Sequence, residues 1–267
     1  MSDPLPQIKR LTWRDPEISG CISRLKENAP LVHCMTNLVA DNFTANVLLA
    51  SGASPAMIPA IEESGEFAGI AGALLLNLGT ITRIDSESMA FAAAAAVKRG
   101  TPWVLDPVAV GVIGFRTGIA AELLKLGPSV IRGNASEIVS LCGREGGGKG
   151  VDSAFSSGDA LPSAFQLARN TSAVVAMSGE TDYITDGVTI IGIEGGHEMM
   201  TRVTAVGCAL GALIAAMLPV APSVLIAAAA ASALFAEAGE RAAGESAGPG
   251  SFAVAFLDQL WAITSGS

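Results

Sequence analysis

The sequence contains few aromatic residues and few basic ones. Phe, Trp and Tyr make up 5% of the 267 residues, and 16 Lys and Arg face 25 Asp and Glu, which gives a formal net charge of −9. A protein that binds a nucleic-acid backbone needs a basic face, and proteins that bind single strands stack the bases on aromatic rings. We therefore expect no nucleic-acid partner.

Cysteine and histidine are too few and too dispersed to build a zinc site from neighbouring residues. No C-x-x-C spacing occurs among the four cysteines, which are Cys21, Cys34, Cys142 and Cys208. Only two histidines, His33 and His197, accompany them. Charged residues between positions 3 and 15 also interrupt any apolar core of a signal peptide. We therefore expect a cytoplasmic protein with free thiols.

One long segment, residues 203–236, contains no charge and could be read as a membrane span. Pro219 and Pro222 divide it into halves that are too short to cross a bilayer alone. Both halves consist mostly of Ala, Gly and Ser rather than Leu, Ile and Phe. The pattern favours two buried helices that pack closely, and no membrane partner.

The chain has the size and hydrophobicity of one α/β domain. Half of its residues are hydrophobic, and no fixed repeat or long linker divides it, so we predict a single domain over residues 1–267. Short apolar runs alternate with helical patterns, which indicates a mostly parallel sheet covered by helices. Strands are expected at 31–35, 56–58, 74–78, 103–106, 129–132 and 173–178, with helices such as 42–50 and 86–99. A hairpin at the sheet edge is expected over 183–191.

Polar residues close five of the predicted parallel strands. In open parallel sheets, ligands bind beyond the carboxyl ends of the strands, so these residues are candidates for one polar rim. The alternative for each is an ordinary turn. The residues are Thr36, Asn37, Asn77, Asp106, Arg132, Gly133, Asn134, Ser178 and Gly179.

Residues 143–150 (GREGGGKG) nearly match the phosphate-binding pattern G-x-x-x-x-G-K-[ST]. Gly150 stands where that pattern requires a hydroxyl that binds magnesium, and residues 137–142 favour a helix where a strand should precede the loop. We interpret the segment as a surface loop.

Residues 205–208 (AVGC) lead into an apolar helix expected over 209–217. The first turn of a helix has unpaired backbone N–H groups and a positive dipole, so small residues there allow an anion to bind the backbone. The alternative is an ordinary turn into a core helix. Cys208 is either inert packing or a thiol whose pKa the helix lowers.

Residues 134–137 (NASE) follow a strand and open another helix. Asn134 and Glu137 match a capping box, which is a structural role. The functional alternative uses Asp106 and Glu137 as carboxylates near a nucleotide-bound magnesium ion, with Arg132 facing phosphate.

Seven segments together resemble the hydroxyethylthiazole kinase family of the ribokinase-like superfamily, and they span nearly the whole chain. They are residues 30–37 (PLVHCMTN), 43–57 (FTANVLLASGASPAM), 105–111 (LDPVAVG), 131–138 (IRGNASEI), 179–187 (GETDYITDG), 207–210 (GCAL) and 248–252 (GPGSF). The resemblance implies a ribokinase-like α/β fold without a lid, with helices on both faces of the sheet. It also implies a homotrimer with sites near subunit boundaries.

The activity that the resemblance implies is ATP- and Mg²⁺-dependent phosphorylation of 4-methyl-5-(2-hydroxyethyl)thiazole, in thiamine biosynthesis and salvage. Cys208 would then be catalytic, Arg132 and Ser178 would bind the nucleotide, and Asp106 and Glu137 the metal. The implied substrate-binding residues are Asn37, Val39, Met57, Ala205 and Gly207. Ala205 replaces a glycine that is usual in the family, and Ser178 replaces a common threonine.

Two rival functions remain open at this point. A related kinase of hydroxymethylpyrimidine would share the sheet and the anion-binding helix entrance, but would differ within residues 36–57. The second rival is a member that binds thiazole or nucleotide without catalysis. It stays open because the thiol of Cys208 is a weak base near neutral pH.

Overall fold

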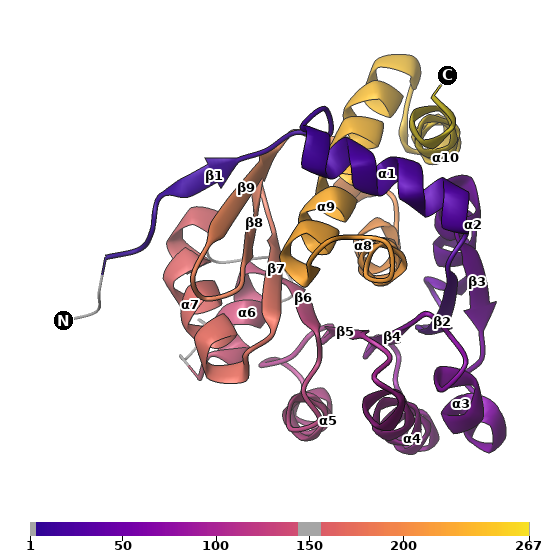
Figure 1. The fold of residues 1–267 in the computed structure, drawn as a ribbon, viewed down its shortest axis with the longest axis vertical. Coiled ribbons are helices and arrows are strands. Elements are labelled where there is room, and N and C mark those ends of the chain that lie inside the picture. Colours follow the sequence, from indigo (N-terminus) through magenta and orange to yellow (C-terminus); the bar gives the residue numbers. More distant parts are fainter. Residues whose placement is uncertain (1–3, 144–155, 267) are drawn as a thin grey trace.

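A nine-stranded sheet forms the centre of the computed structural model, which describes residues 4–143 and 156–266 (Figure 1). The strand order is β1-β9-β8-β7-β6-β5-β4-β2-β3, and β8 is antiparallel to both of its neighbours. The strands are β1 Ile8–Arg10, β2 Leu31–Met35, β3 Ser54–Met57, β4 Ala73–Asn77, β5 Trp103–Asp106, β6 Val130–Asn134, β7 Val174–Ser178, β8 Thr181–Thr185 and β9 Ile190–Glu194.

Helices cover both faces of this sheet, as expected for the α/β class. Side chains alternate between the faces: Leu75 belongs to the core cluster that includes residues of α1, α2, α8, α9 and α10, whereas Leu74 and Leu76 belong to the cluster that includes residues of α3, α4 and α5. The helices are α1 Pro16–Asn28, α2 Asp41–Ala50, α3 Ile61–Ala68, α4 Arg83–Arg99, α5 Gly114–Leu124, α6 Ala135–Leu141, α7 Ser157–Thr171, α8 Val206–Met217, α9 Val224–Glu245 and α10 Pro249–Ser265, with a 3-10 helix η1 Glu198–Arg202.

The predicted strands all form, with boundaries that shift by one or two residues. The predicted hairpin is β8 and β9, but its position at the sheet edge is wrong. β1 pairs in parallel outside β9, with Ile8 opposite Ile190. The sequence IKR gives no strand signal, because it is three residues long and two of them are charged and exposed.

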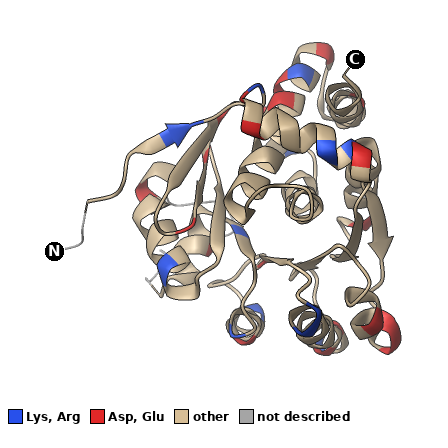
Figure 2. Cartoon of the chain, viewed as in Figure 1, with Lys and Arg blue, Asp and Glu red and all other residues tan. Residues whose placement is uncertain are grey.

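The uncharged segment 203–236 forms α8 and the first half of α9, which pack against each other. α8 lies directly on β2, β4 and β5 and carries no charge, whereas charged residues gather on outer helices such as α1 and α4 (Figure 2). No helix in the described part of the chain is long and apolar enough to cross a membrane.

Candidate active site

The polar rim predicted from the strand ends is present where α8 begins. Asn77 and Asp106 are the last residues of β4 and β5 and lie opposite each other in the parallel register. Asn134 and Ser178 end β6 and β7 in the same way. The parallel sheet thus carries residues that are distant in sequence to one edge.

Arg132 and Asp106 form a buried ion pair at the centre of this rim. Arg132 Nη1 lies 3.6 Å from Asp106 Oδ2, and the two side chains are 11% and 0% exposed. Arg132 Nη2 also donates a hydrogen bond to Ser178 Oγ at 3.0 Å. Burial raises the pKa of Asp106 to about 7, although the Arg132 guanidinium opposes this shift.

Asn37, Asn77 and Cys208 form a second group beside the ion pair. Asn37 Nδ2 donates to Asn77 Oδ1 at 2.8 Å and lies 3.5 Å from Cys208 Sγ. Asn77 Nδ2 donates to Asp106 Oδ2 at 2.7 Å, so the two groups are joined. The prediction that Asn37 and Cys208 share a site fits this geometry.

The entrance of α8 begins with a residue in an unusual backbone conformation. Ala205 has φ 72° and ψ −9°, the left-handed region that glycine favours. Ala205 therefore adopts a backbone conformation that glycine adopts without strain, and this conformation costs the alanine about 1–2 kcal/mol. A Cβ atom on Gly207 would lie 3.2 Å from Arg132 Nη2, so the guanidinium packs directly on the helix entrance.

Of the two alternatives for Cys208, the net shift of its pKa does not favour an acidic thiol. Burial raises the pKa of the Cys208 thiol, and nearby Asp106 raises it further. Arg132 and the amides of Asn77 and Asn37 lower it, but they do not compensate for burial. The positive helix end is therefore not enough to make this partly buried thiol acidic.

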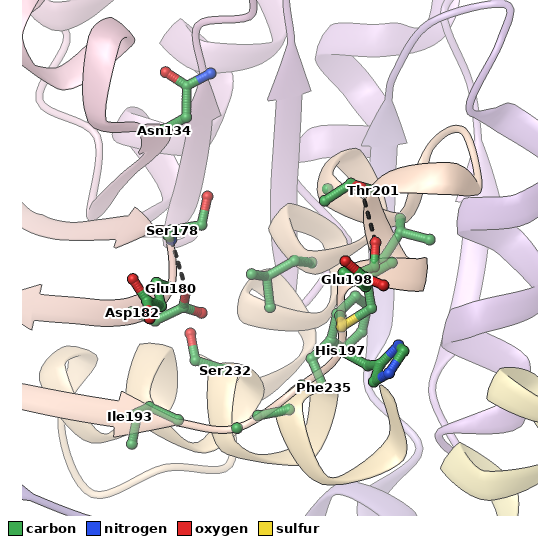
Figure 3. A pocket seen from close by; sticks show the side chains of 18 of the residues that line it. Asn134, Ser178, Glu180, Asp182, Ile193, His197, Glu198, Thr201, Ser232 and Phe235 are labelled. Atoms are coloured by element: carbon green, nitrogen blue, oxygen red, sulfur yellow. Dashed lines mark hydrogen bonds between the residues drawn. The ribbon is translucent and has the colours of Figure 1, made fainter. Parts of the chain in front are cut away.

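A cleft of about 640 Å³ opens on the Arg132 side of the helix entrance. Its wall includes Arg132, Ser178 and Gly207. Figure 3 shows Asp182 and Ser232 on one side of the cleft, and His197 and Glu198 on the other. The volume lies within the range of small-molecule sites.

Asp182 is a site residue that the sequence reasoning did not select. Its carboxylate accepts a hydrogen bond from the Gly179 N–H at 3.0 Å. Burial raises the pKa of Asp182 to about 6, and hydrogen bonds from Gly179 and Ser232 oppose the shift. The segment GETDYITDG contains Asp182, but its pairing with Ser232 on α9 has no signal in the local sequence.

Val39 lies beside Asn37, and Met57 lies at the end of the edge strand β3. The Val39 backbone N–H donates to Asn37 Oδ1 at 3.1 Å, while its side chain is 56% exposed. Met57 ends β3 opposite Cys34 and is partly buried. The candidate phosphate loop 143–150 lies outside the described residues after Gly143.

The capping box predicted for Asn134 and Glu137 is confirmed. Asn134 Oδ1 accepts from the Glu137 N–H at 3.0 Å, and Glu137 Oε2 accepts from the Asn134 N–H at 2.8 Å. Glu137 Oε1 also accepts from the Ala109 N–H at 2.9 Å. Both carboxylate oxygens therefore have a structural role, and a role toward metal stays a prediction.

We expect Glu137→Gln to lower stability, because its NH₂ group must face one of these two backbone donors. An unsatisfied buried donor costs about 1–3 kcal/mol, so at about 2–4 °C per kcal/mol for a chain of this size the melting temperature should fall by about 2–12 °C. The exposed Glu122, which pairs with Lys125, provides the matched control. Glu122→Gln should shift the melting temperature by less than about 2 °C. Equal melting temperatures for the two variants would contradict the structural role of Glu137.

Comparison with solved structures first defines the class. A ribokinase-like superfamily protein from Enterococcus faecalis superimposes with a TM-score of 0.66 at 12% identity, covering 98% of this chain and 99% of that chain. This likeness, with the mostly parallel sheet, identifies the ribokinase-like fold.

The family follows from closer matches. The profile of the hydroxyethylthiazole kinase family matches residues 22–266. A hydroxyethylthiazole kinase from Leptospira interrogans is 58% identical over 253 residues, which are 95% of each chain. The hydroxyethylthiazole kinase structure from Pyrococcus horikoshii has a TM-score of 0.85 at 39% identity and covers 91% of this chain and 92% of that one. The chain belongs to the hydroxyethylthiazole kinase family and is a kinase.

Proposed function

We propose that the protein transfers the γ-phosphoryl group of ATP to the hydroxyl of 4-methyl-5-(2-hydroxyethyl)thiazole, in thiamine biosynthesis and salvage. The observation that carries this proposal is the position of the α8 entrance. Gly207 lines the cleft beside Arg132, whereas the adjacent Cys208 lies against Asn37. A donor nucleotide and an acceptor alcohol could thus meet across one helix terminus.

In this proposal the nucleotide occupies the cleft. Arg132 and Ser178 contact its phosphates, and the N–H groups of the α8 entrance stabilise the charge on the transferring group. The alcohol binds among Asn37, Val39 and Met57, with Ala205 and Gly207 at the helix entrance. Its oxygen bonds to the γ-phosphorus as the bond to ADP breaks, and Cys208 orients the hydroxyl or, in its thiolate form, accepts the hydroxyl proton.

Asp106 and Glu137 are the residues proposed to hold Mg²⁺ together with the nucleotide. Asp106 Oδ1 is buried and, among the described residues, has no hydrogen-bond partner, so it is free to accept a cation or its water. The described part of the chain has no cluster of three or more His, Cys, Asp and Glu that could hold a metal. This fits an ion whose other ligands are phosphate oxygens and water. A bound Mg²⁺ would supply positive charge to those oxygens.

The test is a coupled assay with purified protein, Mg-ATP and one alcohol at a time. We expect ADP and thiazole phosphate to form in equal amounts with the thiazole alcohol. Turnover of hydroxymethylpyrimidine alone would support the rival kinase. Binding of the thiazole without ADP formation would support the binding-only alternative.

We further propose that the protein is a homotrimer with its thiazole sites near subunit boundaries. The family resemblance supports this arrangement, and so do the apolar side chains beside Asn37: Leu38 and Val39 are 85% and 56% exposed. Two such side chains at the mouth of a site suit a neighbouring subunit. Light scattering should give three times the mass of one chain at assay concentration. A fully active monomer would contradict both parts.

The single domain over residues 1–267 and the cytoplasmic location stay predictions. One sheet that contains every strand from β1 to β9 supports the first. Cys21, Cys34 and Cys208, which form no disulfide, favour a reducing compartment and support the second.

A further inference from the structure

Asn77 is a fully buried amide at the end of β4 for which the proposed chemistry has no role. Its Nδ2 donates to Asp106 Oδ2 at 2.7 Å. Its Oδ1 accepts from Asn37 Nδ2 at 2.8 Å and from the Gly79 N–H at 3.0 Å. Asn77 therefore bridges a residue on the phosphate side of the site and a residue on the alcohol side.

The orientation of both amides is fixed by partners that can act in only one way. The Gly79 N–H can only donate, so the Asn77 atom that faces it is the oxygen, and Nδ2 faces Asp106. The Val39 N–H likewise fixes Asn37 Oδ1, so Asn37 Nδ2 faces Asn77 and Cys208. The hydrogen bonds run with one polarity from Asn37 through Asn77 to Asp106, and Asn37 Nδ2 also faces Cys208 as a donor.

Close packing holds this pair of amides in place. A Cβ atom on Gly79 would lie 2.5 Å from Asn37 Nδ2, a distance that only the absence of a side chain permits. The backbone that follows β4 therefore presses directly on Asn37. Because Asn37 Nδ2 also donates to Asn77 Oδ1, the side chain of Asn37 has little freedom to rotate away from Cys208 Sγ.

We propose that Asn77 is a positioning residue that holds the Cys208 sulfur at the helix entrance, both by its own hydrogen bond to the thiol and through Asn37. The inference rests on the proposed function of Cys208. Asn77 touches neither reactant in this arrangement. It links the position of Cys208 to that of Asp106, so that the alcohol and the phosphate are aligned by one hydrogen-bonded network.

A double-mutant cycle tests this coupling. Asn77→Ala should lower kcat by about 10- to 100-fold, the effect of misplacing a reacting group, with a much smaller change in KM for ATP. In a Cys208→Ala background the same change should cost clearly less, because the thiol that Asn77 positions is already gone and only its bond to Asp106 is lost. An equal loss in both backgrounds would overturn the proposal.

Ser88→Ala is the matched control. Ser88 on α4 is also fully buried, and it donates to the Pro59 carbonyl at 2.8 Å, outside the site. Ser88→Ala should leave kcat unchanged while thermal melts show whether each variant is folded. A loss of kcat as large as that of Asn77→Ala would assign the effect to general packing and overturn the proposal. Asn77→Ser replaces Asn77→Ala if the alanine variant does not fold.

A second measurement separates this inference from the proposed function. Iodoacetamide alkylates Cys208 at a rate that depends on the placement of its sulfur, and peptide mass spectrometry measures this rate at one site. Asn77→Ala should change the rate severalfold from that of the parent, even if the parent phosphorylates no alcohol. An unchanged rate would overturn the role of Asn77, whereas an inactive parent alone would overturn only the proposed function.

Discussion

Replacing Arg132 with methionine is expected to reduce kcat/KM for ATP by about 10³-fold, the lower end of the effect of an arginine that stabilises a transferring phosphoryl group. Arg132 pairs with Asp106 and bonds Ser178, and it lines the cleft beside Gly207. Methionine keeps the length of the side chain but removes the charge. Asp106 then loses the cation that lowers its pKa, so its carboxyl group becomes more readily protonated.

The variants Arg132→Lys and Arg24→Met test whether the loss of activity is specific to the guanidinium at position 132. Lysine keeps the charge without the planar fork, so an intermediate loss is expected. Arg24 on α1 is partly buried and donates to the Val220 carbonyl beyond the opposite end of α8, so Arg24→Met tests the loss of an arginine far from the site. Steady-state kinetics with varied ATP measures all three. A near-parental value for Arg132→Met would remove Arg132 from the nucleotide site.

The parts of the site that could be predicted from sequence are those encoded by adjacent residues. Polar residues that close short apolar runs, such as Asp106 at the end of β5, predict the rim because parallel strands end at one edge. The capping box of Asn134 and Glu137 follows from a three-residue spacing. The contacts of the capping box are local in sequence, and the parallel register of the sheet sets the contacts of the rim.

The parts that could not be predicted depend on tertiary contacts or on a balance of opposing effects. Asp182 pairs with Ser232 across fifty positions, and β1 forms only because β9 offers a free edge. The pKa of Cys208 depends on burial, which raises it, and on the surrounding donors, which lower it. A helix N-terminus in the sequence carries no information on burial, so it could not give the net direction of this shift.

Cys208→Ala should lower kcat by no more than about 10²–10⁴-fold, the range for a general base, because Arg132 and the helix entrance continue to stabilise the phosphoryl group. The raised pKa favours the lower part of this range, since a protonated thiol at neutral pH already accepts a proton poorly. Cys21→Ala on α1 removes another buried thiol at a distance and should leave kcat unchanged. A Cys208→Ala variant with parental kcat would reduce the thiol to packing.

Cys208→Asp should keep or raise kcat, because a carboxylate is a base at pH values where this thiol is protonated. The ordinary pKa of Asp is about 3.9, and burial beside Asp106 raises it. Even a value as high as that of Asp106, about 7, leaves the group mostly ionised at pH 8. The measurement is therefore kcat at pH 8 for the parent and both variants, with thermal melts to establish that each is folded. A folded but inactive Cys208→Asp would show that position 208 does not receive the proton of the alcohol.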